Sequence, residues 1–217
     1  SWVTTQYDSG AHPHGFVNPN ALYNPGADIF IIKKGDSMNT AGNGVWDVTG
    51  NEVRVNADGR LIVSGADSLK CVYLTANPGG MGTCGTITII NNGYINIDNY
   101  GWVFDQGLID CVSGDMGTPN GSGYQFDLRF GGILNMHSST IDVGTGVFNT
   151  TEDGQLTTLN VGNGVIKGST FNLKPPCIFY IGSPDGILMS GPLGNIQTTN
   201  RNYFNRIGSY KFIFNGT

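Results

Sequence analysis

Aromatic rings beside amide and carboxylate side chains are the features of this sequence best suited to recognition chemistry. Flat ring faces stack on sugar rings, and neighbouring polar groups hydrogen-bond sugar hydroxyls or the loops of a partner protein. Two segments, 98–105 and 198–205, combine both residue types at close spacing. The sequence therefore predicts a receptor-binding surface that includes Asp98, Tyr100, Trp102, Asn202 and Tyr203.

Core packing is the alternative role of these rings. Trp102 lies in Gly101-Trp102-Val103-Phe104, which also fits a strand with a buried ring, so binding and core packing are equally favoured for it. The same holds for Tyr203. Trp46, in Val45-Trp46-Asp47-Val48, is predicted to be a core residue of a strand.

His12 and His14 are spaced as metal ligands would be in an extended chain, where residues two apart point the same way. Three copies around a threefold axis would offer six imidazoles to an octahedral transition metal. Residue usage favours the alternative, an exposed loop around Pro13. His137 is predicted to be a hydrogen-bonded residue of a sheet.

The four cysteines do not have the spacing of a zinc site, because the nearest two, Cys71 and Cys84, are thirteen residues apart. Those two flank a loop and can face one another across adjacent strands, so a disulfide between them is one possibility. Cys111 and Cys177 are predicted to be small core residues.

Paired carboxylates, as in glycoside hydrolases, are the catalytic arrangement to look for. Asp105 and Asp110 would point to opposite faces of one straight strand, and Asp127 is predicted to form an ion pair with Arg129. The G-x-S-x-G motif is absent, and three histidines provide little general-base capacity. No catalytic residue is predicted, which favours a binding protein over an enzyme.

Composition indicates an all-β chain. Only 12% of the 217 residues are charged, 34 are Gly and Glu occurs twice, so the residues that build exposed helix faces are scarce. The net charge of -5 argues against nucleic acid as a partner. Apolar runs of about four residues, against roughly 20 for a bilayer span, argue against membrane insertion.

Turn chemistry and alternating apolar residues predict four hairpins. Loops at 57–59, 91–93 and 131–133 and a two-residue turn at 163–164 each bring the apolar residues of the flanking strands to one face. Gly59 and Gly93 are expected in the left-handed conformation. Hairpins favour an antiparallel sandwich or prism-like architecture, and an irregular β-solenoid built from short Gly-bounded strands is the second choice.

Further strands are predicted at 27–33, 72–75, 100–112, 139–143, 170–173, 178–181 and 209–214. Residues 1–26 hold four of the nine prolines among polar and aromatic residues and are predicted to be an extended lead-in. Residues 27–217 are predicted to form a single β-rich receptor-binding domain.

The Asn/Gly/Thr-rich strands, the few helix formers, the absence of an initiating methionine and the His-x-His near the front resemble the distal part of a bacteriophage tail fibre or tailspike. The resemblance implies a homotrimeric virion tail protein that attaches to a bacterial surface glycan or an outer-membrane protein. Subunit interfaces would explain the low charge. The only cofactor that the resemblance suggests is a transition metal at the threefold axis.

Two other functions remain open on the sequence. A secreted or cell-surface bacterial adhesin, or lectin-like carbohydrate-binding module, would present the same kind of surface but would be a monomer with an oxidised cysteine pair. A polysaccharide depolymerase would need a carboxylate cluster that the sequence does not locate.

Overall fold

The structure is a computed structural model, and every regular element in its described part is a β-strand. No helix there is long and apolar enough to cross a membrane. Of the predicted lead-in 1–26, only two short strands are described. The described residues are 2–4, 7–8, 29–42, 44–65, 67–77, 84–118, 122–150, 155–173, 177–181, 196–198, 204–206 and 211–214.

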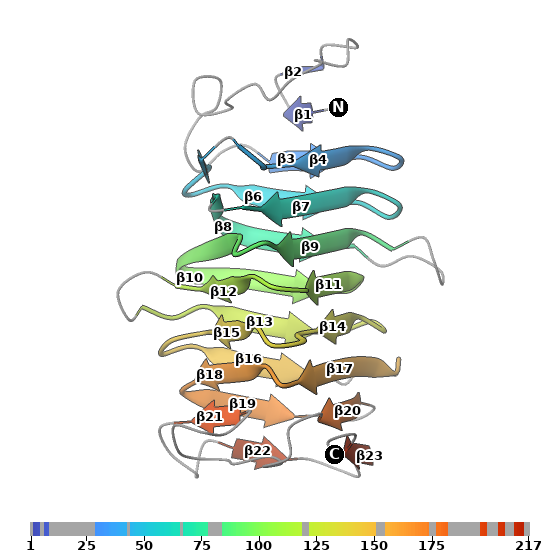
Figure 1. Cartoon of the computed structure of the whole chain (residues 1–217), viewed down its shortest axis with the longest axis vertical. Coiled ribbons are helices and arrows are strands. Elements are labelled where there is room, and N and C mark those ends of the chain that lie inside the picture. The colour runs from blue at the N-terminus through green and yellow to red at the C-terminus, as the bar shows by residue number, and fades with distance from the viewer. Residues whose placement is uncertain are drawn as a thin grey trace.

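The strands form an elongated stack that runs from the N-terminal end at the top of Figure 1 to the C-terminal end at the bottom. Each turn of the chain passes through three strands, one on each of three faces. Each strand pairs in parallel with its counterparts one turn earlier and one turn later. The chain is therefore a parallel β-solenoid of about six turns.

Face 1 is formed by β3 (Ile29–Ile32), β6 (Glu52–Val55), the second halves of β8 (Ser68–Ala76) and β10 (Tyr94–Asp105), β13 (Gln125–Leu128), β16 (Val147–Thr150), β19 (Thr170–Leu173) and β22 (Phe204–Arg206). Face 2 is formed by β4 (Ser37–Asn39), β7 (Arg60–Ser64), β9 (Thr86–Ile90), β11 (Leu108–Cys111), β14 (Ile133–Asn135), β17 (Thr157–Gly162), β20 (Cys177–Ile181) and β23 (Lys211–Phe214).

Face 3 is formed by β5 (Val45–Asp47), the first halves of β8 and β10, β12 (Asp115–Gly117), β15 (Thr140–Asp142), β18 (Val165–Gly168) and β21 (Ile196–Thr198). At the N-terminal end, β1 (Trp2–Thr4) pairs antiparallel with β3 and with β2 (Tyr7–Asp8). The long strands β8 and β10 each bend from face 3 to face 1 and so link the two faces.

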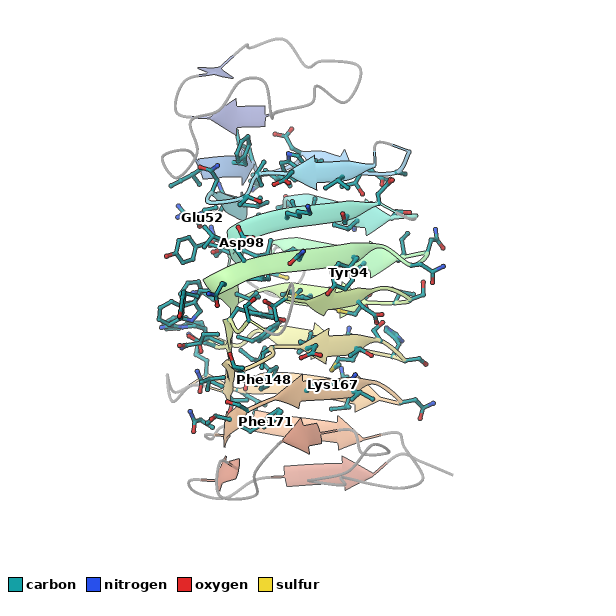
Figure 2. All side chains as sticks on the ribbon, turned by 90° about the vertical axis from the view of Figure 1, so that its left-hand side faces the viewer. Glu52, Tyr94, Asp98, Phe148, Lys167 and Phe171 are labelled. Carbon is teal, nitrogen blue, oxygen red and sulfur yellow. The ribbon has the colours of Figure 1, made fainter. Side chains whose placement is uncertain are left out.

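The core is a set of columns of inward side chains, because alternate residues of each strand point into the solenoid and pair in register with the next turn. Phe126 and Phe148 stack at 5.0 Å, and Phe148 and Phe171 lie 6.1 Å apart, one above the other in Figure 2. Trp46 is 1% exposed and meets Phe30 edge to face, so its predicted core role is confirmed. The column on face 1 contains Phe30, Val53, Leu74, Val103, Phe126, Phe148 and Phe171.

The predicted all-β class is confirmed, and the solenoid, the second choice of architecture, is the one observed. The four hairpins are wrong as pairings: β6 pairs with β3 and β8, whereas β7 pairs with β4 and β9. Yet the apolar residues assigned to a common face in the hairpins with loops at 57–59 and 91–93 are all fully buried. Strands on adjoining faces of a solenoid direct alternate residues into a shared interior, so matching apolar faces cannot distinguish a corner from a hairpin.

Strand positions agree well with the sequence. The predicted strand 170–173 is β19, and the strands predicted at 27–33, 72–75, 139–143, 178–181 and 209–214 overlap β3, β8, β15, β20 and β23. The predicted strand 100–112 is two strands, β10 and β11, because the chain turns a corner at Gln106 and Gly107.

Gly59 and Gly93 are not the left-handed residues of their corners. Asp58 has φ 62°, and Asn91 and Asn92 have φ 53° and 63°. Gly59 is instead required by close packing between turns, since a Cβ there would lie 2.8 Å from the carbonyl oxygen of Ile32. A Cβ at Gly93 would meet the carbonyl group of Val63 in the same way.

Replacing Gly59 with Ala is therefore expected to lower the free energy of unfolding by about 1 to 3 kcal/mol, because the new methyl group meets backbone that cannot rotate away. Asp58→Gly, which relieves a left-handed aspartate, should change it by less than about 1 kcal/mol. Urea unfolding of both variants tests this. A Gly59→Ala protein as stable as the parent would contradict the close approach between the turns.

Candidate functional site

The outward side chains of face 1 form the strip of the molecule with the most varied chemistry. Strand register places them in two columns, with successive side chains about 4.8 Å apart along the solenoid axis. One column contains Glu52, Tyr73, Trp102 and Gln125. The other contains Arg54, Thr75, Phe104, Asp127, Asn149 and Asn172.

Asp127 organises the lower part of this strip. Its carboxylate accepts hydrogen bonds from Trp102 Nε1 at 2.9 Å, Gln125 Nε2 at 2.9 Å and Asn149 Nδ2 at 2.7 Å. Asn149 in turn accepts a bond from Asn172 Nδ2 at 2.8 Å. The predicted ion pair between Asp127 and Arg129 is absent from the ion pairs of the described residues, because Asp127 is engaged by these neutral donors.

A groove of about 530 Å³ occupies the upper part of the strip. Glu52, at the left-hand edge of the stack in Figure 2, binds Arg54 through two hydrogen bonds of 2.8 and 3.0 Å. Thr75 Oγ1 donates to the same carboxylate at 3.2 Å. The groove is lined by Glu52, Arg54, Tyr73, Thr75, Asn77, Phe104, Gln106 and Arg129.

Trp102 lies beside this groove and connects the upper and lower parts of the strip. The indole stacks on Phe104 with ring centroids 5.2 Å apart and an angle of 19° between the planes, while its N–H binds Asp127. The ring is half-buried on the outer face, so the alternative of a core residue is wrong for Trp102. The predicted surface position of Trp102 is the one observed.

The other predicted receptor-binding residues are placed differently. Tyr100, 86% exposed and with φ 61°, stands on the corner between faces 3 and 1. Asp98 accepts a hydrogen bond from the Gly50 N–H at 3.2 Å, and burial is the main reason that its pKa is raised. Neither residue lines the groove. Asn202 and Tyr203 lie outside the described residues.

Sequence reasoning missed Glu52, Tyr73, Phe104 and Arg129 as site residues. A signal was available in the two-residue alternations Glu52-x-Arg54, Tyr73-x-Thr75, Trp102-x-Phe104 and Gln125-x-Asp127, which recur once per turn. Recognising it requires the spacing of the turns to be known.

Metal and thiol chemistry find no support in the described residues. These hold no group of three or more His, Cys, Asp or Glu side chains that could bind a metal, and His12 and His14 lie outside them. Cys71 and Cys84 are both free, so a disulfide between them is not formed. Cys71 points into the core, where burial raises the pKa of the thiol.

His137 is a corner residue with φ 52°, and not the sheet residue that the sequence suggested. Its Nε2 lies 2.9 Å from Asp110 Oδ1. Asp110 faces outward on β11 of face 2. This exposed pair lies on a different face of the solenoid from the groove.

Asp47 and Asp98 are outward carboxylates whose pKa values move in opposite directions. Burial would raise the pKa of Asp47, but hydrogen bonds from Thr49 and the charge of Lys70 bring it below its usual value, whereas that of Asp98 is raised. Such a divergence is typical of an acid and base pair. Here both carboxylates bind backbone N–H groups of the corner at 49–50, which is a structural use.

Comparisons of the chain with protein-family models, with curated proteins and with solved structures find no match. The site is therefore interpreted from its own geometry.

Asp105 is the acid with the most unusual environment. It points into the core and is fully buried, its Oδ1 accepts a hydrogen bond from the Gly107 N–H at 3.3 Å, and its Oδ2 has no partner. Burial raises its pKa well above the usual value. Burial therefore favours the protonated, uncharged form of this carboxyl, and the enclosed side chain cannot reach a substrate outside the solenoid.

This protonation makes stability depend on pH. Above about pH 4 the unfolded chain loses the Asp105 proton, whereas the folded chain keeps it up to its raised pKa. Between these two pKa values the free energy of unfolding should fall by up to about 1.4 kcal/mol per pH unit. In Asp105→Asn this decline should disappear. Urea unfolding between pH 4 and 8 measures it, with exposed Asp115→Asn as the control. Parallel curves for Asp105→Asn and the parent would contradict a buried neutral acid.

Proposed function

We propose that this chain is a glycan-binding attachment protein, and that the outer strip of face 1 binds a bacterial surface polysaccharide. The observation that carries the proposal is the clustering of Tyr73, Trp102 and Phe104 on adjacent turns beside hydrogen-bonding side chains. Aromatic faces bordered by carboxylate, amide and guanidinium groups suit sugar rings. In the tail-fibre context that the sequence resembles, this binding would attach a bacteriophage to its host.

A polymeric ligand fits the strip better than a compact one. The strip runs along the solenoid axis, so successive turns offer aromatic and hydrogen-bonding groups at a constant spacing, as solenoid surfaces do for extended partners. The side chains of the lower part are already fixed by the bonds to Asp127. Fixed side chains lose little conformational entropy when a ligand binds.

Binding without cleavage is the mode that the carboxylates favour. Glu52 is engaged by Arg54 and Thr75, and Asp127 accepts bonds from three neighbours. Asp105 is enclosed in the core. A glycoside hydrolase needs a pair of reactive carboxyls on either side of the scissile bond.

We also propose that the chain assembles with two copies of itself through face 2. Its outward residues are mostly uncharged, so packing there would desolvate few charges. Arg60, Asp110 and Lys211 are the charged residues on the described strands of that face, and Asp110 already faces His137. The uncharged outward positions include Ser37, Asn39, Ile62, Thr86, Thr88, Ile90, Leu108, Ile133, Asn135, Thr158 and Asn160.

Replacing an aromatic residue of the strip should weaken binding to purified surface polysaccharide without unfolding the protein. Tyr73→Ala and Trp102→Ala are each expected to raise Kd by about 10- to 100-fold, the range for loss of an aromatic anchor. Tyr94→Ala on face 3 is the matched control, since Tyr94 is 36% exposed and Tyr73 41%. Isothermal titration measures Kd, and thermal melting verifies the fold.

Equal affinity of all three variants and the parent would exclude this strip as the binding surface. The release of reducing ends from the same polysaccharide, abolished in Asp98→Asn, would indicate a depolymerase instead.

The proposed assembly predicts a particle of three times 23.1 kDa in light scattering at micromolar concentration. Ile133→Asp should dissociate it, because Ile133 is exposed on face 2 and the new carboxylate would be buried at the contact. Val45→Asp, on face 3, should leave the particle intact. A parent protein that remains at 23.1 kDa would rule out the trimer.

A further inference from the structure

Arg129 is a cation without an acidic partner among the described residues. Its Nε is buried and makes no hydrogen bond there. The described ion pairs use Arg54, Lys70 and His137. Asp127, two residues away, is engaged by three neutral donors. The guanidinium of Arg129 thus retains unused donors at the edge of the groove.

Ring contacts and backbone bonds hold Arg129 in place. The guanidinium carbon lies 4.5 Å from the ring centroid of Phe130 and 5.7 Å from that of Phe104. The Arg129 N–H donates to the Asp105 carbonyl at 2.9 Å, and its carbonyl accepts from the Gly132 N–H at 2.9 Å. Cation–π contacts of this kind orient a guanidinium before a ligand arrives.

The groove carries an excess of positive charge although the chain as a whole has a net charge of -5. Glu52 and Arg54 neutralise each other through two hydrogen bonds. Arg129 is the remaining charged residue of the lining. A volume of about 530 Å³ lies within the usual range of small-ligand sites, roughly 300 to 1,000 Å³.

The neutral lining suits a sugar ring. Tyr73 and Phe104 present aromatic surface, and Thr75, Asn77 and Gln106 present hydroxyl and amide groups. Tyr73 is 41% exposed and therefore accessible to a ligand. These groups can bind the ring and the hydroxyls of a saccharide but do not supply a charge.

We infer that Arg129 binds the carboxylate of an acidic sugar unit, of the uronic acid type, whose ring lies in the groove between Tyr73 and Phe104. A planar carboxylate can accept two parallel hydrogen bonds from a guanidinium. The inference rests on the proposed glycan binding and specifies its ligand class as an acidic polysaccharide.

The experiment compares uronic-acid polysaccharides with the same polymers after their carboxyl groups are reduced to alcohols. The probes are polygalacturonate, hyaluronan and heparosan oligosaccharides of equal length, each with its reduced form, together with a sulfated neutral oligosaccharide. Binding to the full chain is measured by titration for the parent, Arg129→Gln, Arg129→Lys and Lys167→Gln. Lys167 lies on β18 of face 3, outside the groove and outside face 2, and serves as the control for loss of one positive charge.

The parent should bind at least one carboxylated probe about 10- to 100-fold more tightly than its reduced form. Arg129→Gln should remove that difference, and Arg129→Lys should restore part of it, since lysine keeps the charge but not the planar fork. Lys167→Gln should behave as the parent. Thermal melting verifies that each variant is folded.

Three results would overturn the inference. One is equal affinity for carboxylated and reduced probes. If Tyr73→Ala still weakens binding in that case, the proposed glycan binding stands and only the role of Arg129 is rejected. Another is preference for the sulfated probe, which assigns the site to a different anion. The third is a folded Arg129→Gln protein with unchanged discrimination. Absence of binding to every saccharide would reject both the inference and the proposed function.

Discussion

The in-register parallel pairing of successive turns is the constraint on which the rest of the structure depends. Once one turn pairs with the next, each residue has its counterpart directly before and after it along the axis. An inward position must then be apolar in turn after turn, as in the column that runs from Phe30 through Val103 to Phe171. Outward positions become continuous columns of surface chemistry. The pairing also satisfies the backbone of interior turns, so open strand edges are confined to the two ends.

Asp105 is a position where the in-register pairing places an ionisable side chain in the core. It occupies a column with Ile32, Val55, Ala76, Leu128 and Thr150, and it is the only one of these six residues with an ionisable side chain. The corner that follows is only two residues long, between the end of β10 and the start of β11. The side chain accepts a hydrogen bond from the Gly107 N–H within that corner. The buried polar group is therefore explained by the tightness of the turn, and burial raises its pKa and so favours its uncharged form.

Burial could be predicted from the sequence more readily than pairing. Val53, Val55, Leu61 and Val63 are all buried as their alternation indicates, because the in/out pattern is local. Which strand pairs with which is not local. Corresponding residues such as Phe30, Val53, Leu74 and Val103 are 21 to 29 residues apart, since the corners differ in length, and this variation hides the repeat. Corners and hairpins use the same turn residues, which explains the choice of an antiparallel architecture.

The groove could not be predicted for the same reason. Glu52, Tyr73, Phe104 and Arg129 come from four successive turns, and only the register brings them together. The outward position of Trp102 was one of the two alternatives that the sequence offered, because its residue type and its polar neighbours also suit a ring on the surface. Asp98 and Tyr100 share that local composition, but the bend of β10 turns them onto the corner, away from the groove.

The same register determines what the strip can recognise. Its side chains are fixed on strands and by one another, so they cannot rearrange to follow an arbitrary ligand, and the spacing along the axis is set by the backbone. A ligand gains most when its own repeat presents ring faces and polar groups at matching intervals. Because Glu52 and Asp127 are already engaged by neighbouring side chains, Arg129 is the charged group of the groove left to select the ligand by charge. In the proposed glycan complex, the rings would determine where that charge must lie relative to the sugar, which would couple affinity for the polymer to discrimination between its units.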